Sequence, residues 1–139
     1  MQKTMKRVRS VSAMFLVLLM AVMTMATTAF ASSVTFSDTS IANGQYQRFT
    51  NYDYENFTIS ANTIVNHDIT FDQNATSVVT SGYCKTNFLG NYSYTNCLSG
   101  NNTKTIKGSF KISTAGEYKM FIYNGSANTI TASSFVLTF

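Results

Sequence analysis

The residue best suited to catalysis is His67, the single histidine of the chain. A serine hydrolase needs an imidazole to accept the serine proton and a carboxylate to orient that imidazole. Asp68 follows His67 directly, but consecutive side chains of a strand point to opposite faces. Asp68 therefore cannot orient the ring if this segment is extended. We expect His67 to be a packed, hydrogen-bonded side chain rather than a catalytic base.

Other catalytic patterns are weak. Asp53 and Glu55 could lie on one side of an extended segment, as the acid pair of a glycosidase does, but such spacing is common in polar loops. The sequence has no EF-hand pattern, His-rich tract or Gly-rich phosphate loop. We predict a protein that is not an enzyme and that uses no metal or cofactor.

The two cysteines, Cys84 and Cys97, have neither Cys-x-x-Cys nor His-flanked spacing, which disfavours redox and zinc chemistry. An even cysteine count in an exported chain favours a disulfide, here worth roughly 3 kcal/mol by restricting the unfolded chain. A hairpin folded about Gly90-Asn91 would set Cys84 opposite Cys97. We therefore predict a disulfide between them, with two buried free thiols as the alternative.

Five tyrosines fall in or beside expected loops, where binding residues concentrate: Tyr52, Tyr54, Tyr83, Tyr92 and Tyr94. A tyrosine ring has an apolar body and a polar tip, which suits glycan stacking or a protein interface. These five side chains form the candidate binding surface. The alternative is that the rings only cover the ends of the fold.

The elements that must position these residues are strands. In the stretch Ile106–Tyr123, apolar side chains alternate with polar ones on both sides of a Ser-Thr-Ala-Gly break. A hairpin with a five-residue loop would set Lys111 against Lys119, and one with a three-residue loop would set Lys111 against Glu117. The third arrangement is an arch from one sheet to another, with Tyr118 bonding back to the backbone as a corner residue. We favour the arch.

Alternation elsewhere predicts further strands. Thr63–Phe71 places His67 among apolar residues on one face, and shorter strands are expected at Val34–Phe36, Tyr46–Phe49, Phe57–Ile59 and Thr76–Tyr83. The first two of these short strands are expected to form an edge hairpin.

Asn124-Gly125 predicts a second hairpin with Ile122 opposite Ile130 and Met120 opposite Ala132, followed by a bulge at Ser133-Ser134. No helical periodicity is evident after residue 31. The expected fold is an all-β, two-sheet antiparallel β-sandwich, jelly-roll or Ig-like, preceded by an N-terminal signal helix.

The N-terminus predicts export. A basic segment precedes the apolar stretch Ala13–Ala26, and Ala29-Phe30-Ala31 supplies a signal-peptidase site of a bacterial type. We expect residues 1–31 to be a cleaved signal peptide and 32–139 to be one domain. Four of the ten basic residues lie in the signal, so the remaining six balance six acids. A neutral mature chain favours neither nucleic acid nor, after cleavage, a membrane as partner.

The segment Phe110–Asn124 combines an apolar strand, a small polar turn, Gly-x-Tyr, alternating apolar residues and a final Asn. It resembles the closing strands of secreted bacterial β-sandwich modules. The nearest named family is the pre-peptidase C-terminal type domain, and small uncharacterised secreted proteins of Gram-positive bacteria are similar in layout. The resemblance implies a fold and carries over no site residue.

These observations predict a secreted, extracellular, non-enzymatic protein that acts by surface contact. Its partner would be the cell envelope, a cell-wall glycan or another protein. The alternative is a small secreted antimicrobial or toxin-like protein, although a neutral mature charge argues against a cationic membrane-disrupting peptide. The sequence gives no indication of the oligomeric state.

Overall fold

A computed structural model describes residues 32–139, which form ten β-strands and no helix. The strands are β1 (Ser33–Phe36), β2 (Thr39–Ile41), β3 (Tyr46–Phe49), β4 (Phe57–Ile59), β5 (Thr63–Phe71), β6 (Val78–Thr86), β7 (Tyr92–Asn101), β8 (Thr105–Ile112), β9 (Gly116–Asn124) and β10 (Ile130–Thr138). The predicted all-β class is confirmed. Within this part of the chain, no helix could cross a membrane. The signal peptide and its helix, predicted for residues 1–31, lie outside the described residues.

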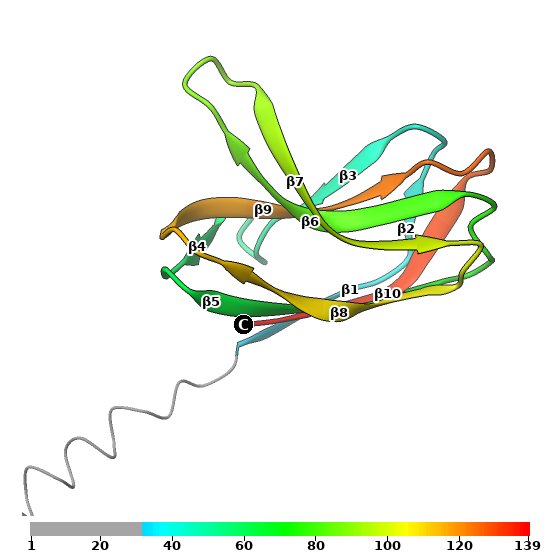
Figure 1. Cartoon of the computed structure of the whole chain (residues 1–139), viewed down its shortest axis with the longest axis horizontal. Coiled ribbons are helices and arrows are strands. Elements are labelled where there is room, and N and C mark those ends of the chain that lie inside the picture. The colour runs from blue at the N-terminus through cyan, green and yellow to red at the C-terminus, as the bar shows by residue number, and fades with distance from the viewer. Residues whose placement is uncertain (1–31) are drawn as a thin grey trace, which may run out of the picture. The chain divides into compact units, whose positions relative to one another are not determined.

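The strands form two antiparallel five-stranded sheets that face each other (Figure 1). The first sheet has the order β1-β10-β5-β8, with β2 also paired to β10. The second sheet has the order β3-β9-β6-β7, with β4 also paired to β9. Inward side chains of both sheets, including Phe71, Met120, Ile122, Phe135 and Leu137, form the buried core. The predicted two-sheet β-sandwich is therefore confirmed.

The stretch Ile106–Tyr123 is an arch, as the sequence analysis favoured. Strand β8 pairs with β5 in the first sheet, whereas β9 pairs with β3, β4 and β6 in the second. Tyr118 Oη donates a hydrogen bond of 2.7 Å to the Thr114 carbonyl oxygen. This bond ties the start of β9 to the turn that precedes it, so Tyr118 is the corner residue.

The hairpin predicted at Asn124-Gly125 is wrong, because β9 and β10 belong to different sheets. The buried Asn124 side chain explains the difference. Its Nδ2 donates to the carbonyl oxygens of Ile41, at 2.9 Å, and Asn128, at 2.8 Å. Its Oδ1 accepts from the Ser126 backbone N–H at 2.9 Å. These bonds hold the loop as a crossing between sheets. The bulge predicted next on β10 is confirmed by a register shift between Ala132 and Ser134.

The edge hairpin predicted at the start of the domain does not form either. Strands β1 and β2 both pair with β10, and β3 pairs with β9 in the other sheet. Strands β1 and β3 lie where alternation predicts them, whereas β2 was not predicted. Alternation shows which side chains share a face, but it contains no information about the partner strand.

Candidate functional site

His67 lies in the core, as predicted. Its side chain is 1 % exposed, and its Nδ1 lies 3.1 Å from Ser81 Oγ across the sandwich. The rings of Phe110 and Phe135 approach it edge-on, with centroids at 4.8 and 4.9 Å. Burial lowers the pKa of His67 to about 3, so the ring is neutral at pH 7. The neighbouring Asp68 lies on the outer face and pairs with Lys107 Nζ at 2.5 Å. His67 is thus a packing residue.

The predicted disulfide is wrong, because both cysteines are free thiols. Strands β6 and β7 do form a hairpin, but Cys84 is opposite Tyr94 rather than Cys97. A bulge between Ser81 and Gly82 leaves Cys97 as the extra, unpaired residue of β7. Glycine is required at the bulge, since a Cβ on Gly82 would lie 2.0 Å from the Thr95 carbonyl oxygen.

The position of the turn explains the difference in register. The Asn87 N–H donates to the Asn91 carbonyl oxygen at 2.8 Å, and Asn87 Oδ1 accepts from the N–H groups of Leu89 and Asn91. The turn is therefore centred on Leu89 and not on the Gly90-Asn91 pair. Asparagine side chains commonly stabilise turns in this way, so Asn87 was the signal in the sequence that pointed to the true register.

The five predicted tyrosines do not form one surface. Tyr83 points inward and packs against Phe110 and Tyr118, at centroid distances of 5.9 and 5.3 Å. Tyr52 and Tyr54 are exposed on the loop before β4, where Tyr52 Oη accepts a 3.3 Å hydrogen bond from the Thr35 N–H. The prediction of a binding residue at Tyr83 does not fit its packed position.

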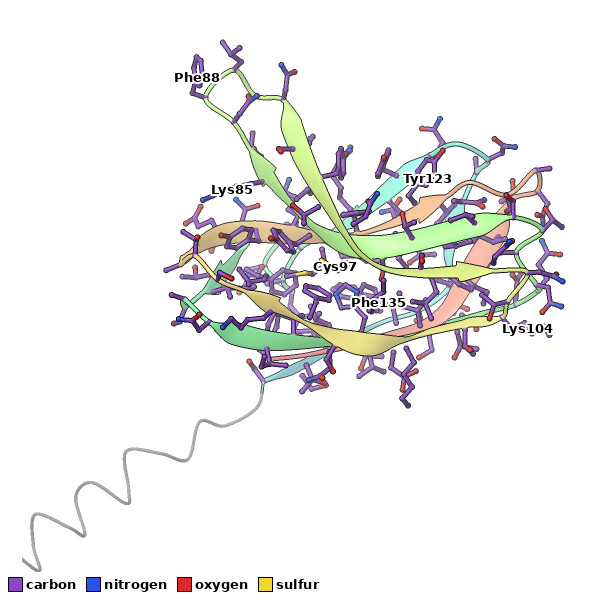
Figure 2. All side chains as sticks on the ribbon, viewed as in Figure 1. Lys85, Phe88, Cys97, Lys104, Tyr123 and Phe135 are labelled. Carbon is purple, nitrogen blue, oxygen red and sulfur yellow. The ribbon has the colours of Figure 1, made fainter. Side chains whose placement is uncertain are left out.

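Tyr92 and Tyr94 lie together on the outer face of the second sheet, with side chains from β3 and β9. We define the tyrosine face as Tyr46, Arg48, Tyr92, Tyr94, Lys119, Phe121 and Tyr123. Strand pairing brings these residues together: Tyr46 is opposite Tyr123, and Cys84 lies between Tyr94 and Lys119. Figure 2 shows Tyr123 among the side chains on the side of the second sheet away from the core.

The aromatic rings of the tyrosine face pack against one another. Tyr46 stacks on Tyr94 with a centroid distance of 4.0 Å and also contacts Tyr123 at 4.6 Å. Tyr46 and Tyr94 together cover Phe121, whose ring is fully buried although it points away from the core. Tyr46 remains 37 % exposed. The rings therefore form a second small apolar cluster that solvent or a partner reaches from outside.

Two cations are built into this cluster. The Arg48 guanidinium lies 4.3 Å from the centroid of the Tyr92 ring, and its Nη1 donates a 2.6 Å hydrogen bond to Tyr94 Oη. Lys119 Nζ lies 5.2 Å from the Tyr92 centroid and donates to Tyr92 Oη at 3.1 Å. Burial alone would lower the pKa of Arg48, but the Tyr94 hydrogen bond and the nearby phenols raise it overall. Arg48 therefore stays fully charged.

Among residues 32–139, the one ion pair joins Lys107 and Asp68, so neither Arg48 nor Lys119 is bonded to a carboxylate. Beneath them lies the buried thiol of Cys84. Burial raises the pKa of this thiol, and the positive charges of Arg48 and Lys119 offset only part of the effect. Burial raises the pKa of Cys97 as well. Both sulfurs are thus held as thiols, the weakly nucleophilic form.

The sequence analysis missed Tyr46, Arg48, Lys119, Phe121 and Tyr123 as members of this surface. The signal was present in the alternation. Phe49 faces the core, so its neighbour Arg48 must face outward. Tyr118 and Met120 also face the core, so Lys119 between them must face outward. What could not be read was that β3, β9, β6 and β7 are neighbours.

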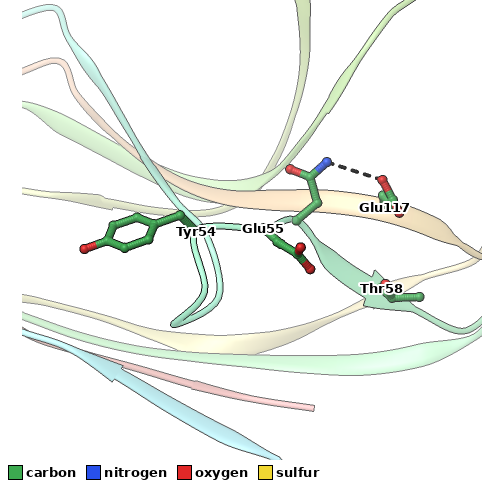
Figure 3. A pocket seen from close by; sticks show the side chains of 5 residues that line it. Tyr54, Glu55, Thr58 and Glu117 are labelled. Atoms are coloured by element: carbon green, nitrogen blue, oxygen red, sulfur yellow. Dashed lines mark hydrogen bonds between the residues drawn. The ribbon is translucent and has the colours of Figure 1, made fainter.

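A separate hollow of about 370 Å³ lies beside β4, lined by Tyr54, Glu55, Asn56, Thr58 and Glu117 (Figure 3). Asn56 Nδ2 donates to Glu117 Oε2 at 3.5 Å. Glu55 and Glu117 both line this hollow, whereas Asp53 does not. Across residues 32–139, no three His, Cys, Asp or Glu side chains gather as metal ligands.

Comparison with known proteins adds no relative: no protein-family model matches the sequence, and no curated protein matches it. The likeness to pre-peptidase C-terminal type domains stays a prediction.

Proposed function

We propose that this protein is a secreted, non-enzymatic binding protein whose tyrosine face contacts an anionic glycan of the cell envelope. The observation that carries the proposal is Arg48. Its guanidinium is held in place by Tyr92 and Tyr94, yet it lacks a carboxylate partner within residues 32–139. One guanidinium N–H donates to Tyr94, and the remaining N–H groups are available to a ligand.

The surroundings of Arg48 favour a sugar acid over a simple ion. Arginine binds carboxylate and phosphate groups in a bidentate manner, and Lys119 adds a second positive charge on the same face. Tyrosine rings and hydroxyls nearby can contact the flat apolar side and the hydroxyls of a sugar ring. The tyrosine face spans four neighbouring strands, which suits a polymer that runs across them.

The strand order supports a jelly-roll topology as the finer description of the fold. Strands β1 and β2 pair with the same strand, as do β3 and β4, so each of these two pairs can be counted as one interrupted strand. The domain then has eight strands, and the sheet orders are 1-8-3-6 and 2-7-4-5. This is the arrangement of two interleaved Greek keys, which also occurs in lectin domains. Fold alone does not determine function, so the proposal depends on the tyrosine face and not on the topology.

Affinity electrophoresis of residues 32–139 tests the proposal. We expect slower migration in gels that contain polygalacturonate than in gels that contain neutral dextran, and the effect should weaken with salt. Loss of a charge-assisted bond should weaken binding about tenfold or more in Arg48→Gln. Lys104→Gln is the matched control, because Lys104 is an exposed cation on the β7–β8 turn, outside the tyrosine face.

Two results would contradict the proposal. The first is equal migration of the protein in the anionic and neutral gels across a series of uronic-acid and phosphate polymers. The second is equal weakening by Arg48→Gln and Lys104→Gln, which would mean that any positive charge contributes in the same way.

A further inference from the structure

The β6–β7 hairpin extends past the sandwich, and its tip stands clear of both sheets (Figure 1). Phe88 and Leu89 lie at this tip, where their side chains are 95 % and 69 % exposed. Figure 2 shows Phe88 at the far end of the hairpin. Contiguous exposed apolar patches mark sites of contact with proteins or membranes.

The tip is a firmly held turn. The Asn87 carbonyl oxygen accepts from the Gly90 N–H at 3.0 Å, in addition to the two hydrogen bonds that Asn87 Oδ1 accepts. Gly90 has a φ of +82°, a conformation that glycine adopts without strain. The turn therefore presents Phe88 and Leu89 outward in a fixed geometry.

The hairpin carries a positive charge and no acidic residue. Residues 78–101 contain Lys85 but no aspartate or glutamate, whereas all six acids of residues 32–139 lie elsewhere. Tyr92 is opposite Thr86 in the last pair before the turn, and Arg48 and Lys119 lie against its ring. From the sandwich toward the tip, the order is therefore two cations, then Tyr92, then the apolar side chains of Phe88 and Leu89.

We propose that this hairpin tip inserts into the surface layer of a lipid bilayer. Phe88 and Leu89 would enter the region beneath the headgroups, and Tyr92 would lie at headgroup level, where tyrosine is enriched. Arg48 and Lys119 would face anionic headgroups. Binding should be weak and reversible, at or below the roughly 10⁴ M⁻¹ of a single acyl chain.

A lipid surface fits the tip better than a protein does. An aromatic side chain buries about 150–250 Å², so Phe88 and Leu89 together offer far less than the roughly 800 Å² per partner of a stable protein interface. Insertion into lipid needs no complementary surface. The sequence analysis expected no membrane partner because the domain has no net charge. Net charge gives no information about an exposed apolar tip such as this one. This proposal does not depend on glycan binding.

The chain contains no tryptophan, so Phe88→Trp would introduce a single fluorescent reporter at the tip. We expect its emission to shift to the blue when residues 32–139 meet vesicles of phosphatidylglycerol and phosphatidylcholine, and brominated lipids should quench it. Tyr54→Trp is the matched control, because Tyr54 is 91 % exposed on a different loop. It should show neither effect. An unchanged Phe88→Trp spectrum overturns the proposal.

Vesicle sedimentation of Phe88→Ser/Leu89→Ser gives a second test. The double variant should sediment at least tenfold less, with an unchanged melting temperature because both side chains are exposed. Full retention of sedimentation overturns the proposal, as does a dimer in gel filtration that the double variant abolishes without any change in lipid binding. Arg48→Gln should weaken binding to the anionic vesicles and leave binding to pure phosphatidylcholine unchanged.

Discussion

The outer faces of the two sheets differ although both arise from the same alternation of residues. On the first sheet, polar side chains bond to one another: Lys107 pairs with Asp68, and Ser109 Oγ donates to Asn66 Oδ1 at 2.5 Å. On the second sheet, tyrosines stack over a buried phenylalanine and hold two cations that no carboxylate within residues 32–139 neutralises.

This difference distinguishes a face where a cation is paired with an acid from one where aromatic rings hold cations in place without an acid. Opposite charges that face each other across strands stabilise a sheet, as on β5 and β8, where Asp68 is directly opposite Lys107. On β3 and β9, Arg48 is opposite Phe121 instead. The cross-strand partner, rather than the residue type, decides which cation is free.

The largest expected effect is on stability. Phe121→Ala should lower the free energy of unfolding by about 3–5 kcal/mol, because it removes a fully buried ring from beneath Tyr46 and Tyr94. Ile64→Ala on the other outer face should cost less than about 1 kcal/mol, since Ile64 is half exposed. Urea denaturation of both variants measures the contrast. Equal losses would mean that the tyrosine face is no more cohesive than the polar face.

Acid should act on the interior before it acts on either face. The pKa of His67 is about 3 in the folded chain, against about 6.5 when unfolded, so between these two pH values mainly the unfolded chain binds the proton. The free energy of unfolding should therefore fall by about 2–3 kcal/mol between pH 6.5 and 4.5. His67→Gln should show a much flatter profile over this range. A similar slope in both proteins would place the acid sensitivity on surface carboxylates.

The thiol of Cys84 reports on whether the tyrosine face opens. Without reductant, iodoacetamide should modify both cysteines under denaturing conditions, since neither is bonded. In the folded protein, the half-buried Cys97 should react before the buried Cys84. Tyr94→Ala should increase the rate of Cys84 modification roughly tenfold, because removal of the ring opposite Cys84 exposes its sulfur. Mass spectrometry measures both rates, with Asn96→Ala on the same strand as the control.

The smallest effect compares the two kinds of cation. Arg48→Gln should cost about 1 kcal/mol of stability through loss of the Tyr92 contact and the Tyr94 hydrogen bond. Lys107→Gln should cost no more than about 0.5 kcal/mol, because an exposed ion pair contributes little. Thermal unfolding of both variants at low and high salt measures the two losses. A larger loss in Lys107→Gln would reverse the comparison.

The sequence predicted strands and faces well, because alternation is local. His67 among apolar neighbours, Tyr118 at a corner and the bulge beside Ser134 all follow from a few adjacent residues. Strand partners were predicted poorly, because Asn124-Gly125 resembles a hairpin turn until the buried contacts of Asn124 are known. The tyrosine face depends on those partners, so only Tyr92 and Tyr94 were identified in advance.

Strand β10 lies between β5 on one side and β1 with β2 on the other. The central position of the first sheet is thus held by β10, which comes later in the chain than each strand it pairs with. Of the described strands, β6 and β7 alone are consecutive and directly paired. Such long-range pairing slows folding. During synthesis, β1 and β2 have no partner strand until residues 130–138 emerge, whereas β5 can pair with β8 before that. The first sheet is therefore completed only after the rest of the domain has been made.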